Sequence, residues 1–98
     1  MSLEKVPVVW VTGASRGIGA AVARAFGEIG ATVVLSGRNA RALRRNTREM
    51  ERLGQKATFV ECDVTSELSV RRARDSISKR FGAVDVIVNN AGVTYFKS

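Results

Sequence analysis

The sequence predicts an α/β fold: a parallel sheet with strand order 3-2-1-4 and helices packed on its flanks. Short apolar runs rich in β-branched residues alternate with longer segments of helical periodicity, which is typical of this class. Most positions on both faces of each run are apolar, as in strands buried inside a parallel sheet. Right-handed crossovers between successive strands then favour the order 3-2-1-4.

Four apolar runs are the expected strands. Each run is followed by glycine or polar residues, so the strands should cover residues 6–11, 31–35, 57–62 and 84–89. Trp10 lies in the first strand, where we expect it to pack against a helix. Cys62 ends the third strand, and we expect it to be a buried, inert thiol.

Three helical segments connect these strands. The first runs from Ile18, the second opens at the N-cap Asn39, and the third opens near Thr65 or Ser66. Each ends at a glycine, at positions 30, 54 and 82, as helices commonly do. The expected apolar faces are Val22, Ala25, Phe26 and Ile29 in the first helix, Leu43, Met50 and Leu53 in the second, and Val70, Ala73, Ile77 and Phe81 in the third.

The composition bounds the class of protein. A chain of 98 residues holds one domain, and no run approaches the ~18 apolar residues of a membrane span. With one Cys and no His, the chain has no internal disulfide, and the usual zinc sites and His-dependent catalytic triads are excluded. A reducing, cytoplasmic setting fits best.

A glycine-rich loop joins the first strand to the first helix. Gly13 permits the tight turn, Gly17 leaves room for a pyrophosphate against the backbone, and Gly19 lets the helix pack close to the sheet. The helix N-terminus offers free N–H groups and a partial positive charge to phosphates. A strand before the loop and a helix after it are what a dinucleotide-binding loop of a Rossmann-type fold requires. The alternative is a glycine-rich turn without a ligand.

Three motifs at strand ends carry a resemblance to a known family. They are Thr12-Gly13-Ala14-Ser15-Arg16-Gly17-Ile18-Gly19, Asp63-Val64 and Asn89-Asn90-Ala91-Gly92. The chain resembles the short-chain dehydrogenase/reductase family over essentially its whole length, and its overall look is similar to the 3-oxoacyl-carrier-protein reductases. The resemblance implies a truncated Rossmann-type sheet, half of a doubly wound fold, from an enzyme that transfers hydride between a nicotinamide cofactor and a carbonyl or secondary alcohol.

The residues after the second strand indicate which cofactor binds. Folds that select NAD usually place an acid there to hold the ribose 2′-hydroxyl, but no carboxylate occurs between Glu28 and Glu49. Arg38 stands where a guanidinium can bind a 2′-phosphate, and Arg16 can add a second charge from the glycine loop. We therefore expect NADP(H). The alternative is that Arg38 is a solvated arginine at a helix start.

The resemblance also implies the residues that contact the cofactor. They are Gly13, Ser15, Arg16, Gly17, Ile18 and Gly19 at the pyrophosphate, Arg38 at the 2′-phosphate, Asp63 and Val64 at the adenine, and Asn90, Ala91 and Gly92 at the ribose-facing floor.

No catalytic residue is expected in this chain. The family's catalytic pair is Tyr-x-x-x-Lys, but Tyr95 is the only tyrosine and the position four residues later lies beyond Ser98. We therefore expect residues 1–98 to be a single dinucleotide-binding domain, the N-terminal part of a longer enzyme, and inactive alone. The fourth strand would then be a sheet edge that invites pairing with another copy, consistent with a homo-oligomer.

The net charge of +7 leaves other functions open. Arg41, Arg45, Arg48 and Arg52 follow helical spacing and form an outward stripe, which indicates a solvated face or a surface for an acidic carrier protein or nucleic acid. A basic nucleic-acid binder is disfavoured because aromatic residues are only 6% of the chain. A non-catalytic nucleotide-binding module that self-associates or docks to a partner is the other alternative.

Overall fold

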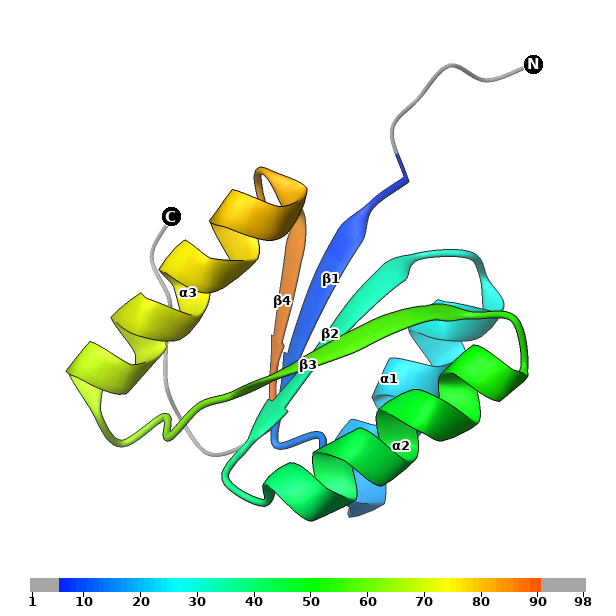
Figure 1. Ribbon diagram of the computed structural model, residues 1–98, viewed down its shortest axis with the longest axis horizontal. Helices are drawn as coiled ribbons and strands as arrows, with labels where there is room; N and C mark the ends of the chain where they lie inside the picture. The colour runs from blue at the N-terminus through cyan, green and yellow to red at the C-terminus, as the bar shows by residue number, and fades with distance from the viewer. Residues whose placement is uncertain (1–5, 91–98) are drawn as a thin grey trace.

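The computed structural model describes residues 6–90 and contains one four-stranded parallel sheet (Figure 1). The strands follow the order β3-β2-β1-β4. This order confirms the predicted Rossmann-like class. The elements are β1 (Val8–Thr12), α1 (Gly17–Glu28), β2 (Thr32–Gly37), α2 (Ala40–Arg52), β3 (Lys56–Glu61), α3 (Glu67–Phe81) and β4 (Val86–Asn89).

A helical layer covers each face of the sheet, with α1 and α2 on one side and α3 on the other (Figure 1). Val9 and Val11 of β1 belong to the core beneath α1 and α2, which includes Leu43. Trp10 belongs to the core beneath α3, which includes Ile77. Because successive side chains of a strand point to opposite faces, β1 contributes to both cores. The expected packing of Trp10 against a helix is confirmed.

The predicted apolar face of α1 is partly wrong. Ala25 and Ile29 are exposed, and Val22 and Phe26 are only half-buried. The residues of α1 that are buried against the rest of the fold are the small ones, Gly19, Ala20, Ala23 and Gly27. A Cβ on Gly27 would lie 2.6 Å from the methyl carbon of Met50. Because α1 lies so close to its neighbours, this face requires residues with small side chains, whatever their hydrophobicity.

The ends of α2 and α3 follow the predicted capping chemistry. The side chain of Asn39 accepts a hydrogen bond of 3.0 Å from the N–H of Ala42. Ser66, rather than Thr65, caps α3 and accepts from the N–H of Ser69 at 3.2 Å. The predicted burial of Leu53 is wrong, because this residue lies where the chain leaves α2 and is 62% exposed.

Among residues 6–90, β4 forms one edge of the sheet and pairs only with β1. Its side chains Val86 and Ile87 are 39% and 38% exposed. The N–H of Asp85 donates to the Val8 carbonyl at 2.9 Å, and its carboxylate accepts from the Val8 N–H at 2.8 Å. The strand starts later than the predicted residue 84, because this Asp85–Val8 pair precedes the regular ladder.

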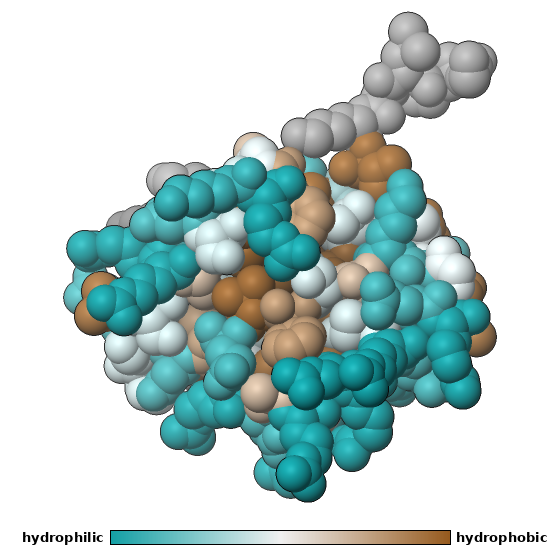
Figure 2. All heavy atoms as spheres, viewed as in Figure 1, coloured by the Kyte–Doolittle hydropathy of each residue, from teal (hydrophilic) through white to brown (hydrophobic). Residues whose placement is uncertain are grey.

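Hydrophilic side chains crowd over α2 and α3, with a strip of apolar surface between them (Figure 2). The outward position predicted for Arg41, Arg45, Arg48 and Arg52 is confirmed, since all four are exposed. No helix in the described part of the chain is long and apolar enough to cross a membrane.

Candidate functional site

The candidate site lies where β1, β2 and β3 end. The carboxyl ends of parallel strands meet at one edge of a sheet, so the loops that follow them converge. They surround a hollow of about 330 Å³, which we call the strand-end pocket. Its lining combines six predicted site residues with three neighbours and consists of Gly13, Ser15, Arg16, Gly37, Arg38, Cys62, Asp63, Val64 and Thr65.

The glycine loop has the backbone geometry that its sequence predicts. Gly13 and Gly17 have φ angles of +64° and +63°, which residues with a Cβ rarely adopt. A Cβ on Gly19 would overlap the carbonyl oxygen of Gly13, so only glycine allows this approach. A Cβ on Gly17 would have no neighbouring atom within 4 Å, which leaves the backbone open to a ligand. Ile18 is 76% exposed at the start of α1 and does not line the strand-end pocket.

A second hollow, the arginine pocket, adjoins the first and measures about 430 Å³. It shares Ser15, Arg16 and Arg38 with the strand-end pocket. Asn39, Ala42 and Arg45 complete its lining. Three guanidinium groups and no carboxylate therefore face one space, which favours an anion with several negative oxygens.

Arg45 is a site residue that sequence reasoning assigned only to the outward stripe. Side chains on a helix lean toward its N-terminus, so a residue in the second turn of α2 can reach the space beside Arg38. Arg48, one turn later, does not line this pocket. The sequence carries no signal that separates these two arginines, since both belong to the same outward stripe of the helix.

Asp63 is held in a defined orientation by the next turn. Its Oδ1 accepts from the backbone N–H of Thr65 at 3.0 Å and from the Thr65 hydroxyl at 2.6 Å. These hydrogen bonds, followed by the charge of Arg38, lower the pKa of Asp63 below its ordinary value. Cys62 is buried as predicted, and burial raises the pKa of its thiol. The pocket thus presents one carboxylate that stays ionised at neutral pH and one thiol that stays protonated.

Thr12 ties the end of β1 to the end of β4. Its hydroxyl donates to Oδ1 of Asn89 at 2.9 Å and accepts from the backbone N–H of Asn90 at 3.2 Å. Asn90 is therefore anchored beside the glycine loop, although it does not line the strand-end pocket. The predicted residues Ala91 and Gly92, like Tyr95, lie outside the described residues.

Asn46 of α2 is a second residue that sequence reasoning missed. Its side-chain nitrogen donates to the carbonyl oxygens of Ala14 and Ser15 at 3.1 and 2.8 Å. The sequence held a signal, because Asn46 lies three residues after Leu43 and four before Met50, on the buried side of the helix. An uncharged amide there needs hydrogen-bond partners inside the fold.

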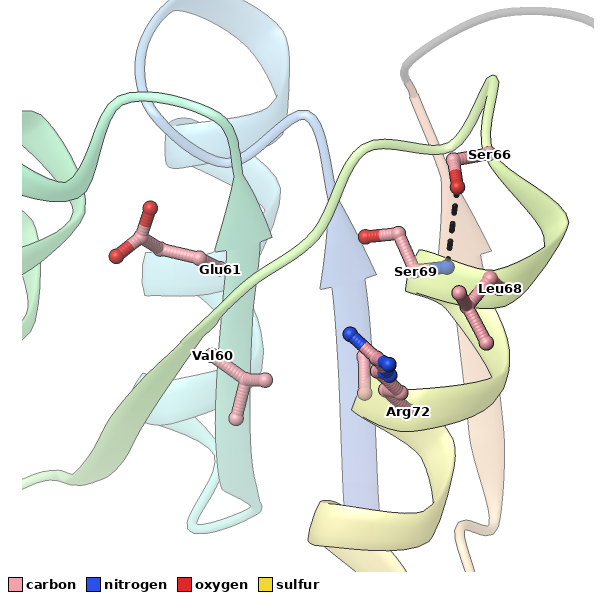
Figure 3. A pocket seen from close by; sticks show the side chains of 7 residues that line it. Val60, Glu61, Ser66, Leu68, Ser69 and Arg72 are labelled. Carbon is pink, nitrogen blue, oxygen red and sulfur yellow. Dashed lines mark hydrogen bonds between the residues drawn. The ribbon is translucent and has the colours of Figure 1, made fainter.

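Another hollow lies between β3 and the start of α3, away from the predicted residues (Figure 3). It measures about 290 Å³, and Arg72 extends from α3 toward the sheet beside it. Glu61 is the other charged residue of its lining, and the hydroxyl of Ser66 is taken by the cap of α3. This arrangement contains no cluster of like charges and no nucleophile with a base.

Known proteins resemble the chain in sequence and in structure. The family model described as short chain dehydrogenase matches residues 7–98. L-fucose dehydrogenase from Oryctolagus cuniculus is 47% identical over 85 residues, which are 87% of this chain and 28% of that enzyme.

Two solved structures match the same arrangement of elements. The F189W actinorhodin polyketide ketoreductase with NADPH has a TM-score of 0.85 and 38% identity, over 89% of this chain and 33% of that one. A metagenomic short-chain oxidoreductase in complex with NADP has a TM-score of 0.84 and 43% identity, over 92% and 41% of the two chains. The chain therefore spans less than half of the length of each of these proteins.

Proposed function

This chain belongs to the short-chain dehydrogenase family, and on that premise we propose that it is the NADP(H)-binding part of a longer oxidoreductase. The observation that carries the proposal is the arginine pocket, where Arg16, Arg38 and Arg45 face one space beside the glycine loop. The solved ketoreductase with NADPH and the oxidoreductase with NADP support this choice of cofactor.

The residues around the two pockets fit a dinucleotide with a 2′-phosphate. The open backbone at Gly17 and the first turn of α1 suit a pyrophosphate, because helix N-termini carry free N–H groups and partial positive charge. Arg38 and Arg16 bind the 2′-phosphate, and we add Arg45 as a third guanidinium. No carboxylate lines the arginine pocket to hold a ribose 2′-hydroxyl instead.

Asp63 and Val64 form the adenine end of the site. Thr65 donates both of its hydrogen bonds to Oδ1 of Asp63, and among residues 6–90 Oδ2 accepts none. That oxygen can accept from the amino group of adenine while Val64 provides apolar contact. Gly13, Ser15, Ile18 and Gly19 complete the phosphate loop, and Asn90 leads to Ala91 and Gly92 at the ribose.

When bound, the cofactor would supply hydride-transfer chemistry: its reduced form would give hydride to a carbonyl carbon, and its oxidised form would take hydride from the carbinol carbon of a secondary alcohol. The residues of this chain bind and orient that cofactor. We assign no catalytic acid or base to these residues. The groups that transfer the proton would come from other parts of the longer protein. We propose a small carbonyl or alcohol substrate, a cytoplasmic location and a homo-oligomeric assembly for that protein.

Calorimetric titration of the purified chain with NADPH and, separately, NADH tests the proposal. We expect saturable binding that favours NADPH, and a loss of that preference in Arg38→Ala. Equal affinity for both cofactors would contradict the 2′-phosphate assignment. A folded chain that binds neither would contradict its role as a cofactor-binding unit.

A second candidate function, self-association, is favoured by the half-exposed Val86 and Ile87 on the edge strand β4. A lysine on such an edge disfavours pairing between copies. We therefore expect Ile87→Lys to lower the mass of any oligomer of this chain in sedimentation equilibrium. An unchanged mass would remove this candidate.

A further inference from the structure

Asn46 joins α2 to the glycine loop through two hydrogen bonds from one nitrogen. Its Nδ2 lies 3.1 Å from the carbonyl oxygen of Ala14 and 2.8 Å from that of Ser15. Because both partners are acceptors, the group facing them must be the NH₂ of the amide, and both of its protons are used. The helix that carries it is anchored by Leu43 and Met50, which are fully buried.

These two bonds determine where the loop's own donors point. A trans peptide unit is planar, so its C=O and N–H point in opposite directions. The carbonyl of Ala14 shares a peptide unit with the N–H of Ser15, and the carbonyl of Ser15 shares one with the N–H of Arg16. Holding both carbonyls toward Asn46 therefore turns both N–H groups away from α2.

The two N–H groups have no well-formed hydrogen bond of their own. Among residues 6–90, the N–H of Ser15 makes none, and the N–H of Arg16 only turns toward the carbonyl of Gly13 in the turn over Ala14 and Ser15. Both residues line the strand-end and arginine pockets. The neighbouring N–H of Ala14, by contrast, donates to the carbonyl of Ser36 at 2.9 Å. Two free donors next to a positively charged hollow are suited to phosphate oxygens.

We propose that Asn46 is a positioning residue for the cofactor, which holds the glycine loop so that the N–H groups of Ser15 and Arg16 are presented to the pyrophosphate. This inference rests on the proposed function, since it concerns the same loop. The proposed role of Asn46 differs from that of the arginines. Asn46 acts at the pyrophosphate, which NADPH and NADH share, whereas Arg38 acts at the 2′-phosphate, which only NADPH carries.

The test compares Asn46→Asp with the wild type by calorimetry with NADPH and NADH, below the melting temperature of each variant. Aspartate keeps the size of the side chain but replaces the NH₂ by an oxygen that repels the two carbonyls. We expect both affinities to fall by a similar factor, about tenfold, so that their ratio stays constant. Asn46→Leu, which also lacks the donors, serves if the aspartate variant does not fold.

Thr47→Val is the matched control, since Thr47 is the next residue of α2 and its buried hydroxyl has no hydrogen-bond partner. We expect this variant to bind both cofactors as the wild type does. A lower melting temperature for Asn46→Asp with unchanged affinities would show a merely structural role and overturn the inference. A fall in NADPH affinity alone would overturn it too, because Asn46 would then act at the 2′-phosphate. A folded wild type that binds neither cofactor would overturn the proposed function itself.

Discussion

The hydroxyl of Thr12, at the end of β1, donates a hydrogen bond of 2.9 Å to the side-chain oxygen of Asn89, at the end of β4. The same hydroxyl accepts from the N–H of Asn90 at 3.2 Å. One buried side chain thus connects the start of the glycine loop to the segment that leads away from β4. These two stretches are 77 residues apart in the sequence, and the parallel pairing of β1 with β4 brings them together.

Thr12→Val tests this connection, because valine keeps the shape and removes every hydrogen bond of the hydroxyl, including a longer one of 3.4 Å to the carbonyl oxygen of Val88. The oxygen of Asn89 and the N–H of Asn90 would lose a partner in a partly buried place, so we expect a loss of about 1–3 kcal/mol in the free energy of unfolding. Urea denaturation measures it. Thr47→Val is the control, since the Thr47 hydroxyl has no partner, and it should cost little. Equal losses in the two variants would contradict the role given to Thr12.

Arg45→Met tests whether NADPH affinity depends on a charge inside the arginine pocket or on the overall positive charge of α2. Methionine keeps much of the apolar stem and removes the charge, so NADPH affinity should fall about tenfold, the effect of losing one charge-assisted contact. NADH affinity should change little. The control is Arg48→Met, which removes the same charge one turn away from the pocket. If both variants weaken NADPH binding equally, the effect belongs to the general field of the helix and not to Arg45.

Gly19→Ala and Gly17→Ala should both lower the stability of the fold, but for different physical reasons. A Cβ at position 19 meets the Gly13 carbonyl, so the loop must move, and we expect a loss of several kcal/mol in stability together with loss of cofactor binding. A Cβ at position 17 meets no atom, and only the positive φ disfavours it, at about 1–2 kcal/mol. Thermal unfolding monitored by circular dichroism gives both values. A tolerated Gly19→Ala would show that the loop has more room than its geometry implies.

The raised pKa of the Cys62 thiol predicts that the stability of the fold depends on pH in the alkaline range. Burial raises the pKa of this thiol in the folded chain, so the unfolded chain ionises first, near pH 8.5. The contribution of this thiol to the free energy of unfolding is therefore fully present below that pH. It is lost as the pH rises through the pKa of the thiol in the folded chain. Between pH 7 and 9.5, the free energy of unfolding should fall more steeply in the wild type than in Cys62→Ala. Parallel curves would mean that the thiol titrates alike in both states.

Much of the fold follows from local chemistry that the sequence displays. Alternating strand and helix patterns specify a parallel sheet, and right-handed crossovers leave few other strand orders. Asn39 and Ser66 cap helices through hydrogen bonds to residues only three positions later in the sequence. The loops after β1, β2 and β3 had to converge because parallel strands end on one side, so Arg16, Arg38 and Asp63 could be assigned to one site in advance.

Only the tertiary structure decided which residues of the helices matter. The buried face of α1 consists of small residues because the Met50 methyl and Gln55 lie against Gly27, and no periodicity reveals such a distance. Arg45 and Arg48 look alike in sequence, but the direction of α2 relative to β2 brings only Arg45 to the arginine pocket. Asn46 meets Ser15 across 31 residues, and its role arises from the packing of one helix against one loop. Local patterns determined the elements and the strand-end site by themselves, whereas contacts between distant elements depend on how those elements pack.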